Sequence, residues 1–139
     1  MQEASVAGLI QGRSVITEAP QSSVREAARI MAGHRIGAVP VVDGRHLIGI
    51  FTERDVLTRV IAAGRDVDQT RLEEVMTRRP ETVSVECPLS EALEVMLDGR
   101  FRHLPVMADG EVIGVISMRD IRLQHHKLWA QGGEVAEPV

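Results

Sequence analysis

Two short segments of this sequence carry the same set of groups that could hold a nucleotide. They are GIFTERD (residues 49–55) and GVISMRD (residues 114–120), and both contain a hydroxyl residue followed three positions later by an aspartate. A hydroxyl and unpaired backbone N–H groups at the beginning of a helix can bind phosphate oxygens. An aspartate one turn later can accept hydrogen bonds from both ribose hydroxyls. The candidate ligand-binding residues are therefore Thr52, Asp55, Ser117 and Asp120.

The same pattern has a purely structural interpretation. A hydroxyl residue followed three positions later by an acidic residue forms a capping box, in which the carboxylate accepts a hydrogen bond from the backbone N–H of the first residue. The recurrence of the pattern does not decide between the two interpretations, because both helices need a cap. Ligand binding and helix capping both remain open at this stage.

Basic residues accompany both segments. Arg54 and Arg119 lie inside them, and RFRHLP (residues 100–105) adds Arg102 and His103 just before a predicted strand. Arginine suits the geometry of phosphate groups. The alternative is a basic face that is simply solvated. We nevertheless expect a local positive field within a chain whose formal net charge is −4.

The two segments belong to two copies of one unit. When the sequence is shifted by 65 positions, residues 17–55 align with residues 82–120 without a gap. Chance rarely aligns a proline, a glycine and an aspartate in one register. The shift superposes the pairs Pro40 and Pro105, Gly49 and Gly114, and Asp55 and Asp120.

Each copy predicts the element order β-α-β-β-α. An apolar stripe with helical spacing follows a predicted cap at Ser23 in the first copy. The second copy has Pro88 at that position, which suits the first turn of a helix. Asp-Gly pairs between apolar runs predict one hairpin in each copy. These pairs differ by one position in the shifted register, so the two turns need not have the same shape. The predicted strands are residues 15–19, 38–42, 47–51, 82–85, 104–107 and 112–116.

Composition excludes several classes of function. Hydrophobic residues make up 44% of the 139 residues and aromatic residues only 2%, which predicts an aliphatic core. The acidic balance argues against non-specific nucleic-acid binding, and no apolar run approaches the roughly 18 residues of a membrane span. With one cysteine and no secretory signal pattern, we expect a cytoplasmic protein. The absence of recognisable catalytic motifs predicts no enzymatic activity, no metal site and no catalytic cofactor.

The segments RIGAVPVVD, LIGIFTERD and FRHLPVMADGEVIGVISMRD resemble paired cystathionine β-synthase (CBS) repeats, the regulatory pair also called a Bateman module. The resemblance covers the chain from about Ile10 to His125. It implies a mixed α/β (α+β) fold in which two β-α-β-β-α repeats pack through their sheets with pseudo-two-fold symmetry. We place repeat one at residues 1–65, repeat two at 66–128 and a C-terminal tail at 129–139.

The resemblance also implies a function. It predicts a stand-alone regulatory module that binds an adenosine-containing ligand (AMP, ATP, NAD(H) or S-adenosylmethionine) in a cleft between the repeats. It predicts a homodimer as well. The alternative is a dimerisation scaffold without a ligand.

Carried over residue by residue, the resemblance places both aspartates at ribose hydroxyls and the two hydroxyl residues near ribose or phosphate. Arg102 and His103 would contact phosphate. Gly37 and Ala38 occupy the matching positions of the first copy, so the two clefts are not equivalent. The residues expected to flank the adenine are Ile16, Ile36 and Phe101.

Overall fold

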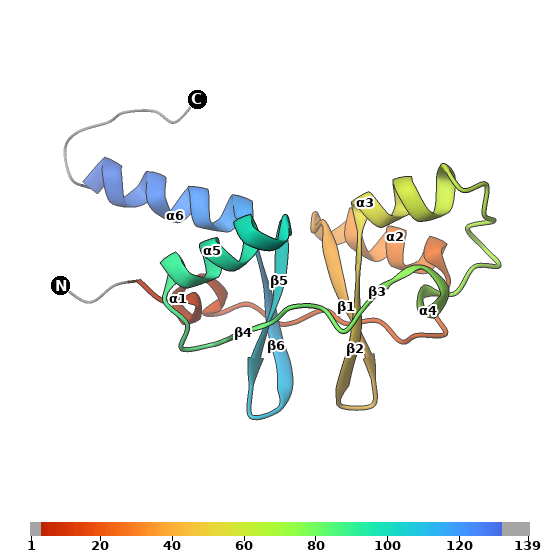
Figure 1. Ribbon diagram of the computed structural model, residues 1–139, viewed down its shortest axis with the longest axis horizontal. Helices are drawn as coiled ribbons and strands as arrows, with labels where there is room; N and C mark the ends of the chain where they lie inside the picture. The colour runs from red at the N-terminus through yellow and green to blue at the C-terminus, as the bar shows by residue number, and fades with distance from the viewer. Residues whose placement is uncertain (1–3, 132–139) are drawn as a thin grey trace.

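Two halves with the same order of elements form the molecule (Figure 1), and the computed structural model describes residues 4–131, with side chains to residue 124. This confirms the predicted mixed α/β fold with two repeated units. The first half contains α2 (Val24–His34), β1 (Ala38–Asp43), β2 (His46–Thr52), α3 (Glu53–Asp55) and the π-helical segment η1 (Val56–Ile61). The second contains β4 (Val83–Ser84), α5 (Leu89–Gly99), β5 (His103–Ala108), β6 (Glu111–Ser117) and α6 (Met118–Gln131).

The end of the chain extends the last helix beyond the expected boundary of the tail. Helix α6 continues to Gln131, so residues 129–131 are helical. The remaining part of the expected tail, residues 132–139, lies outside the described residues.

The first helix of each half follows its predicted stripe. In α2 the buried side chains are Val24, Ala27 and Met31, which recur with helical spacing, and the Ser23 hydroxyl accepts a hydrogen bond from the Glu26 amide at 3.1 Å. Helices α2 and α5 both end on an arginine in the left-handed conformation, with φ of 56° at Arg35 and 58° at Arg100. This ending turns the chain sharply and begins the next strand within a few residues.

The two hairpins differ in their turns, a difference that the shifted Asp-Gly pairs left open. The turn between β1 and β2 has a positive φ only at Gly44, the first of its two central residues, whereas Asp109 and Gly110 both have positive φ in the second turn. These signs correspond to type II′ and type I′ turns. In Figure 1 both turns point to the same end of the molecule, and the first residues of β1 and β5 therefore lie at the opposite end.

Segments of the chain cross between the two cores. Helix α1 (Val6–Ile10) packs into the core of the second half, whereas α4 (Leu72–Val75) packs into that of the first. Strand β3 (Thr77–Arg78) pairs with β2 and completes the first sheet. The strand predicted at residues 15–19 is reduced to one parallel bridge between Glu18 and Val41. The cores therefore do not coincide residue for residue with the repeats of the sequence.

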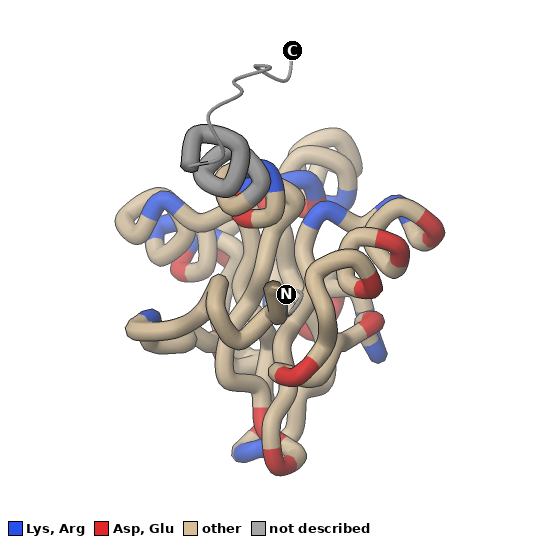
Figure 2. Tube along the Cα trace, turned by 90° about the vertical axis from the view of Figure 1, so that its left-hand side faces the viewer, with Lys and Arg blue, Asp and Glu red and all other residues tan. Residues whose placement is uncertain are grey.

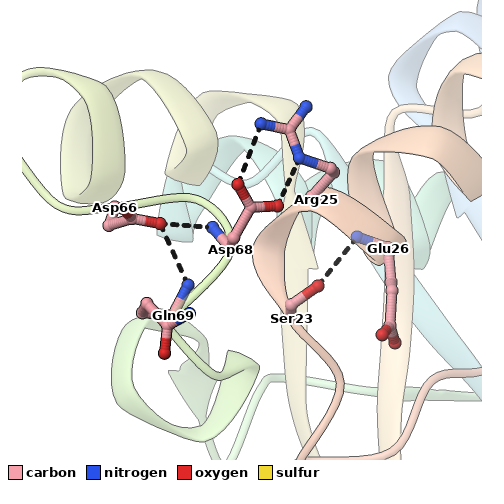
Figure 3. Close-up of polar contacts among 6 residues, drawn as sticks. All are labelled: Ser23, Arg25, Glu26, Asp66, Asp68 and Gln69. Carbon is pink, nitrogen blue, oxygen red and sulfur yellow. Dashed lines mark hydrogen bonds and ion pairs between the residues drawn. The ribbon is translucent and has the colours of Figure 1, made fainter.

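Polar contacts hold the connection between the halves against α2 (Figure 3). The Asp66 carboxylate accepts hydrogen bonds from the amides of Asp68 at 2.7 Å and Gln69 at 3.1 Å, which shapes the loop. The Nε and Nη2 groups of Arg25 both donate hydrogen bonds to the Asp68 carboxylate, the second at 3.1 Å. This hydrogen-bonded pair lowers the pKa of Asp68 and raises that of Arg25. Because the pair is solvent-exposed, it contributes to the position of the loop more than to overall stability.

The two sheets meet between the halves, where β6 contacts both β1 and β2. Within residues 4–131, no helix is long and apolar enough to cross a membrane.

The crossing of α4 into the first core predicts a large effect of one substitution. Leu72 is fully buried there, so Leu72→Ala should lower the free energy of unfolding by about 2–5 kcal/mol. Gln69→Ala, at an exposed position of the same connection, should change it by less than about 0.5 kcal/mol. Urea unfolding of both variants measures the difference. A loss below about 1 kcal/mol for Leu72→Ala would show that α4 does not belong to the core.

Candidate functional site

A cavity of about 1020 Å³ lies between the two halves, at the end of the sheets away from the hairpin turns. Its volume is at the upper end of the range for small-molecule sites. Five regions of the chain line it: the segment between α1 and α2, the last turns of α2, the beginnings of β1 and β5, the beginnings of α3 and η1, and the junction of β6 with α6. Both halves therefore contribute to one site.

The lining of the cavity combines basic side chains with a group of apolar ones, here called the apolar wall. The apolar wall contains Val15, Ile16, Ala28, Met31 and Ile36. Among the residues whose side chains the structure describes, five arginines and two carboxylates line the cavity, although the chain as a whole is acidic. Figure 2 shows several Arg positions gathered at the end of the molecule where α6 begins. The charged lining residues are Arg13, Arg35, Arg102, Arg119, Arg122, Glu53 and Asp120.

The carboxylate of Asp120 lies at the beginning of α6, inside the cavity. Its Oδ2 accepts a hydrogen bond from the Ser117 amide at 2.9 Å, and the Ser117 hydroxyl accepts one from the Asp120 amide at 3.0 Å. The second oxygen, Oδ1, forms an ion pair with Arg13 Nη1 at 3.3 Å. The Arg13 side chain is 54% exposed, so a pair of this kind contributes little free energy and can be exchanged for a ligand.

The corresponding carboxylate of the first half, that of Asp55, is buried outside the cavity lining. Its Oδ2 accepts a hydrogen bond from the Thr52 amide at 3.0 Å, and the Thr52 hydroxyl accepts one from the Asp55 amide at 3.1 Å. Both halves therefore contain complete capping boxes, which supports the structural interpretation of the motif. Ligand binding remains compatible with the box that faces the cavity.

His103 and Glu53 approach each other across the boundary between the halves. A Cβ atom placed on Gly37 would lie 3.0 Å from both Glu53 Oε1 and His103 Nε2, so the missing side chain allows this approach. Burial lowers the pKa of His103, and the nearby positive charge of Arg102 acts in the same direction. The carboxylates of Glu53 and Asp120 oppose this shift but do not cancel it.

The cavity brings together eight of the residues predicted from the sequence. Thr52, Arg54, Asp55 and Phe101 are not among its lining residues, and Phe101 instead packs against the core of the second half. The eight residues that line it are Ile16, Ile36, Gly37, Arg102, His103, Ser117, Arg119 and Asp120.

The predicted site residues leave out four charged lining residues: Arg13, Arg35, Glu53 and Arg122. Arg122 follows Arg119 by three positions, so helical spacing could have placed it on the same face of α6. Glu53 stands at the unspecified position of the motif. Arg13 precedes the part of the chain that superposes without a gap, and no local pattern indicated its contact with Asp120.

Comparison with known proteins adds a family to this geometry. The family model of the CBS domain matches the chain twice, at residues 10–62 and 72–125. The chain belongs to the CBS domain family. It is 45% identical over 123 residues to the CBS domain-containing protein CBSCBSPB3 of Arabidopsis thaliana. The aligned region covers 85% of this chain but 22% of that protein. The chain thus spans about a fifth of the length of this and similar Arabidopsis relatives.

Solved CBS structures match nearly the whole chain. A Burkholderia ambifaria protein described as a signal-transduction protein with CBS domains is 32% identical, with a TM-score of 0.84, and the match covers 96% of this chain and 100% of that one. A CBS domain protein of Pyrobaculum aerophilum complexed with AMP is 27% identical with a TM-score of 0.77, and the match covers 84% of this chain and 89% of that one. The CBS domain pair of protein MJ0100, in complex with 5′-methylthioadenosine and S-adenosyl-L-methionine, is 29% identical with a TM-score of 0.78. The match covers 91% of this chain and 99% of that one.

The lowered pKa of His103 predicts a pH dependence of stability. Because the ordinary histidine pKa is about 6.5 and the folded value is lower, the unfolded chain binds the proton more readily below that pH. Acidification from pH 8 to pH 5.5 should therefore destabilise the wild type more than His103→Gln, which carries no titrating group. Urea midpoints of both proteins at the two pH values measure this, with pH 8 as the internal reference. An equal loss in both proteins would contradict the predicted role of His103.

Proposed function

We propose that the cavity binds an adenosine-containing ligand and that binding regulates a partner through the packing of the two halves. The observation that carries this proposal is the lining itself, in which five arginines and an apolar wall share one cavity of an acidic chain. An apolar base and an anionic phosphate are complementary to such a site. The ligands considered are AMP, ATP, NAD(H) and S-adenosylmethionine.

Each part of the ligand has a matching part of the site. The adenine would lie against Val15, Ile16 and Ile36, as an aromatic ring does on aliphatic side chains. A ribose hydroxyl would donate to Asp120 Oδ1 in place of Arg13. The phosphate would lie near Arg102 and the beginning of α6, where the helix dipole favours an anion.

Regulation would follow from the position of the site between the halves. A ligand that contacts both halves binds best to one relative arrangement of them and shifts the population toward it. The AMP and S-adenosylmethionine complexes of structural relatives support this class of ligand. We propose binding and not turnover as the function, because the contacts of the Asp120 carboxylate go to the Ser117 backbone amide and to Arg13.

A second candidate function is a dimerisation scaffold in which the motifs act only as caps. It is favoured by the capping boxes, which are complete without any ligand. The helical faces also expose large apolar side chains, such as Leu57 at 62% and Ile61 at 57%. We propose that these side chains contribute to a homodimer contact, which is compatible with either function.

Ligand binding can be tested by thermal unfolding with AMP, ATP, NAD, NADH and S-adenosylmethionine in turn. At a concentration of about 100 times its dissociation constant, a true ligand should add about 2.7 kcal/mol and raise the melting temperature by several degrees. For AMP, ATP, NAD and NADH, Arg102→Ala should reduce this shift because it removes one of the groups proposed to bind phosphate; S-adenosylmethionine has no phosphate and does not test this residue. The surface counterpart of Arg102→Ala, Arg45→Ala in the first hairpin turn, should not reduce the shift.

The panel also separates the two candidate functions. A flat response to every compound, on protein shown to contain no carried-over ligand, would contradict the proposed function and favour the scaffold.

The homodimer can be tested by light scattering during gel filtration. The wild type should elute with twice the mass of the chain, whereas the double variant Leu57→Glu/Ile61→Glu should be monomeric because two carboxylates would be buried at the contact. Circular dichroism checks that the double variant keeps its helices. A dimer that survives both substitutions would place the contact elsewhere.

A further inference from the structure

We infer that each chain binds one adenosine ligand, at Asp120, and that the matching motif around Asp55 stabilises the fold and binds no ligand. This inference rests on the proposed function. It concerns which of the two copies of the motif retains a ligand site, and it follows from the groups that occupy the second oxygen of each carboxylate.

The second oxygen of Asp55 is held by an anchored arginine. Arg59, one turn later along the chain, forms an ion pair with Asp55 Oδ1 at 3.4 Å. Its Nη1 also donates to the backbone carbonyls of Met76 at 3.0 Å and Val75 at 3.3 Å. Arg59 thereby links the capping carboxylate, η1 and the end of α4. A ribose hydroxyl at Asp55 Oδ1 would compete with Arg59, which two backbone hydrogen bonds hold in place, whereas Arg13 has no such anchor among the described contacts of its side chain.

The second oxygen of Asp120 meets a different kind of partner. Arg13 reaches it from the segment between α1 and α2, and Asp120 is the one side-chain partner that the structure gives Arg13 within residues 4–124. The shift of 65 positions aligns Gln124 with Arg59 of the first copy, so α6 has no arginine at the position that contacts Asp55 in the first half. A ligand can therefore displace Arg13 and leave the remaining packing unchanged.

The residues around the two carboxylates also differ in the shifted register. Val15 and Ile16, which form part of the apolar wall, correspond to Pro80 and Glu81. Arg122 of the cavity corresponds to Leu57. The side of Asp55 thus carries a carboxylate where the adenine would lie and lacks one of the positive charges available to a phosphate. Both changes disfavour an adenosine ligand there.

Calorimetric titration tests this inference, with AMP, NADH and S-adenosylmethionine as probes in separate experiments. The expected stoichiometry is one per chain for each probe that binds. Asp120→Asn should weaken binding about tenfold or more, because a hydrogen bond to a charged group contributes roughly 1.5–3 kcal/mol. Asp55→Asn should leave the affinity within about twofold.

Because Asp55 is buried and its variant could unfold, an exposed pair provides the second comparison. Arg119→Ala, inside the cavity, should weaken binding, whereas Arg54→Ala at the matching position of the first copy should not. Two ligands per chain, or equal losses in the two members of either pair, would overturn the inference while leaving the proposed function intact. Failure of every probe to bind would remove the proposed function, and this inference with it.

Discussion

The structure depends on a hydrogen-bonded cap at each junction between a hairpin and the helix that follows it. The carboxylates of Asp55 and Asp120 accept hydrogen bonds from the backbone amides of Thr52 and Ser117 and fix the point at which each strand ends. A buried amide without a partner at these junctions would cost about 1–3 kcal/mol. Because each cap requires only one carboxylate oxygen, the second is available for another contact. The same motif can therefore serve folding and binding together.

The two copies differ in what that second oxygen meets. In the first half Arg59 connects it to the end of α4, which packs into the same core. In the second half α1 occupies the corresponding side of the core, and the exposed segment after it supplies Arg13. The crossing of α1 and α4 is the same in both halves, so the asymmetry of the site comes from single residues such as Arg59, which is replaced by Gln124 in the second copy.

Much of the fold could be predicted because its signals are local. Helical stripes, a Ser23 cap and Asp-Gly pairs act over a few residues, and their repetition defined both halves. Contacts that depend on tertiary packing could not be predicted in this way. The pairing of Arg13 with Asp120 joins residues more than 100 positions apart, and the first strand is reduced to a bridge although its sequence is apolar. The approach of Glu53 to His103 likewise depends on how the halves meet.

The most direct test of the ligand site is a map of backbone amide shifts in isotope-labelled protein titrated with AMP and, separately, with S-adenosylmethionine. Our account predicts the largest shifts for the amides of residues 117–120, at the beginning of α6, and of Val15 and Ile16 in the apolar wall. The amides of Arg54 and Asp55, which do not line the cavity, should shift much less. Equal shifts at both junctions, or shifts confined to the surface away from the cavity, would contradict the assignment of the site to Asp120.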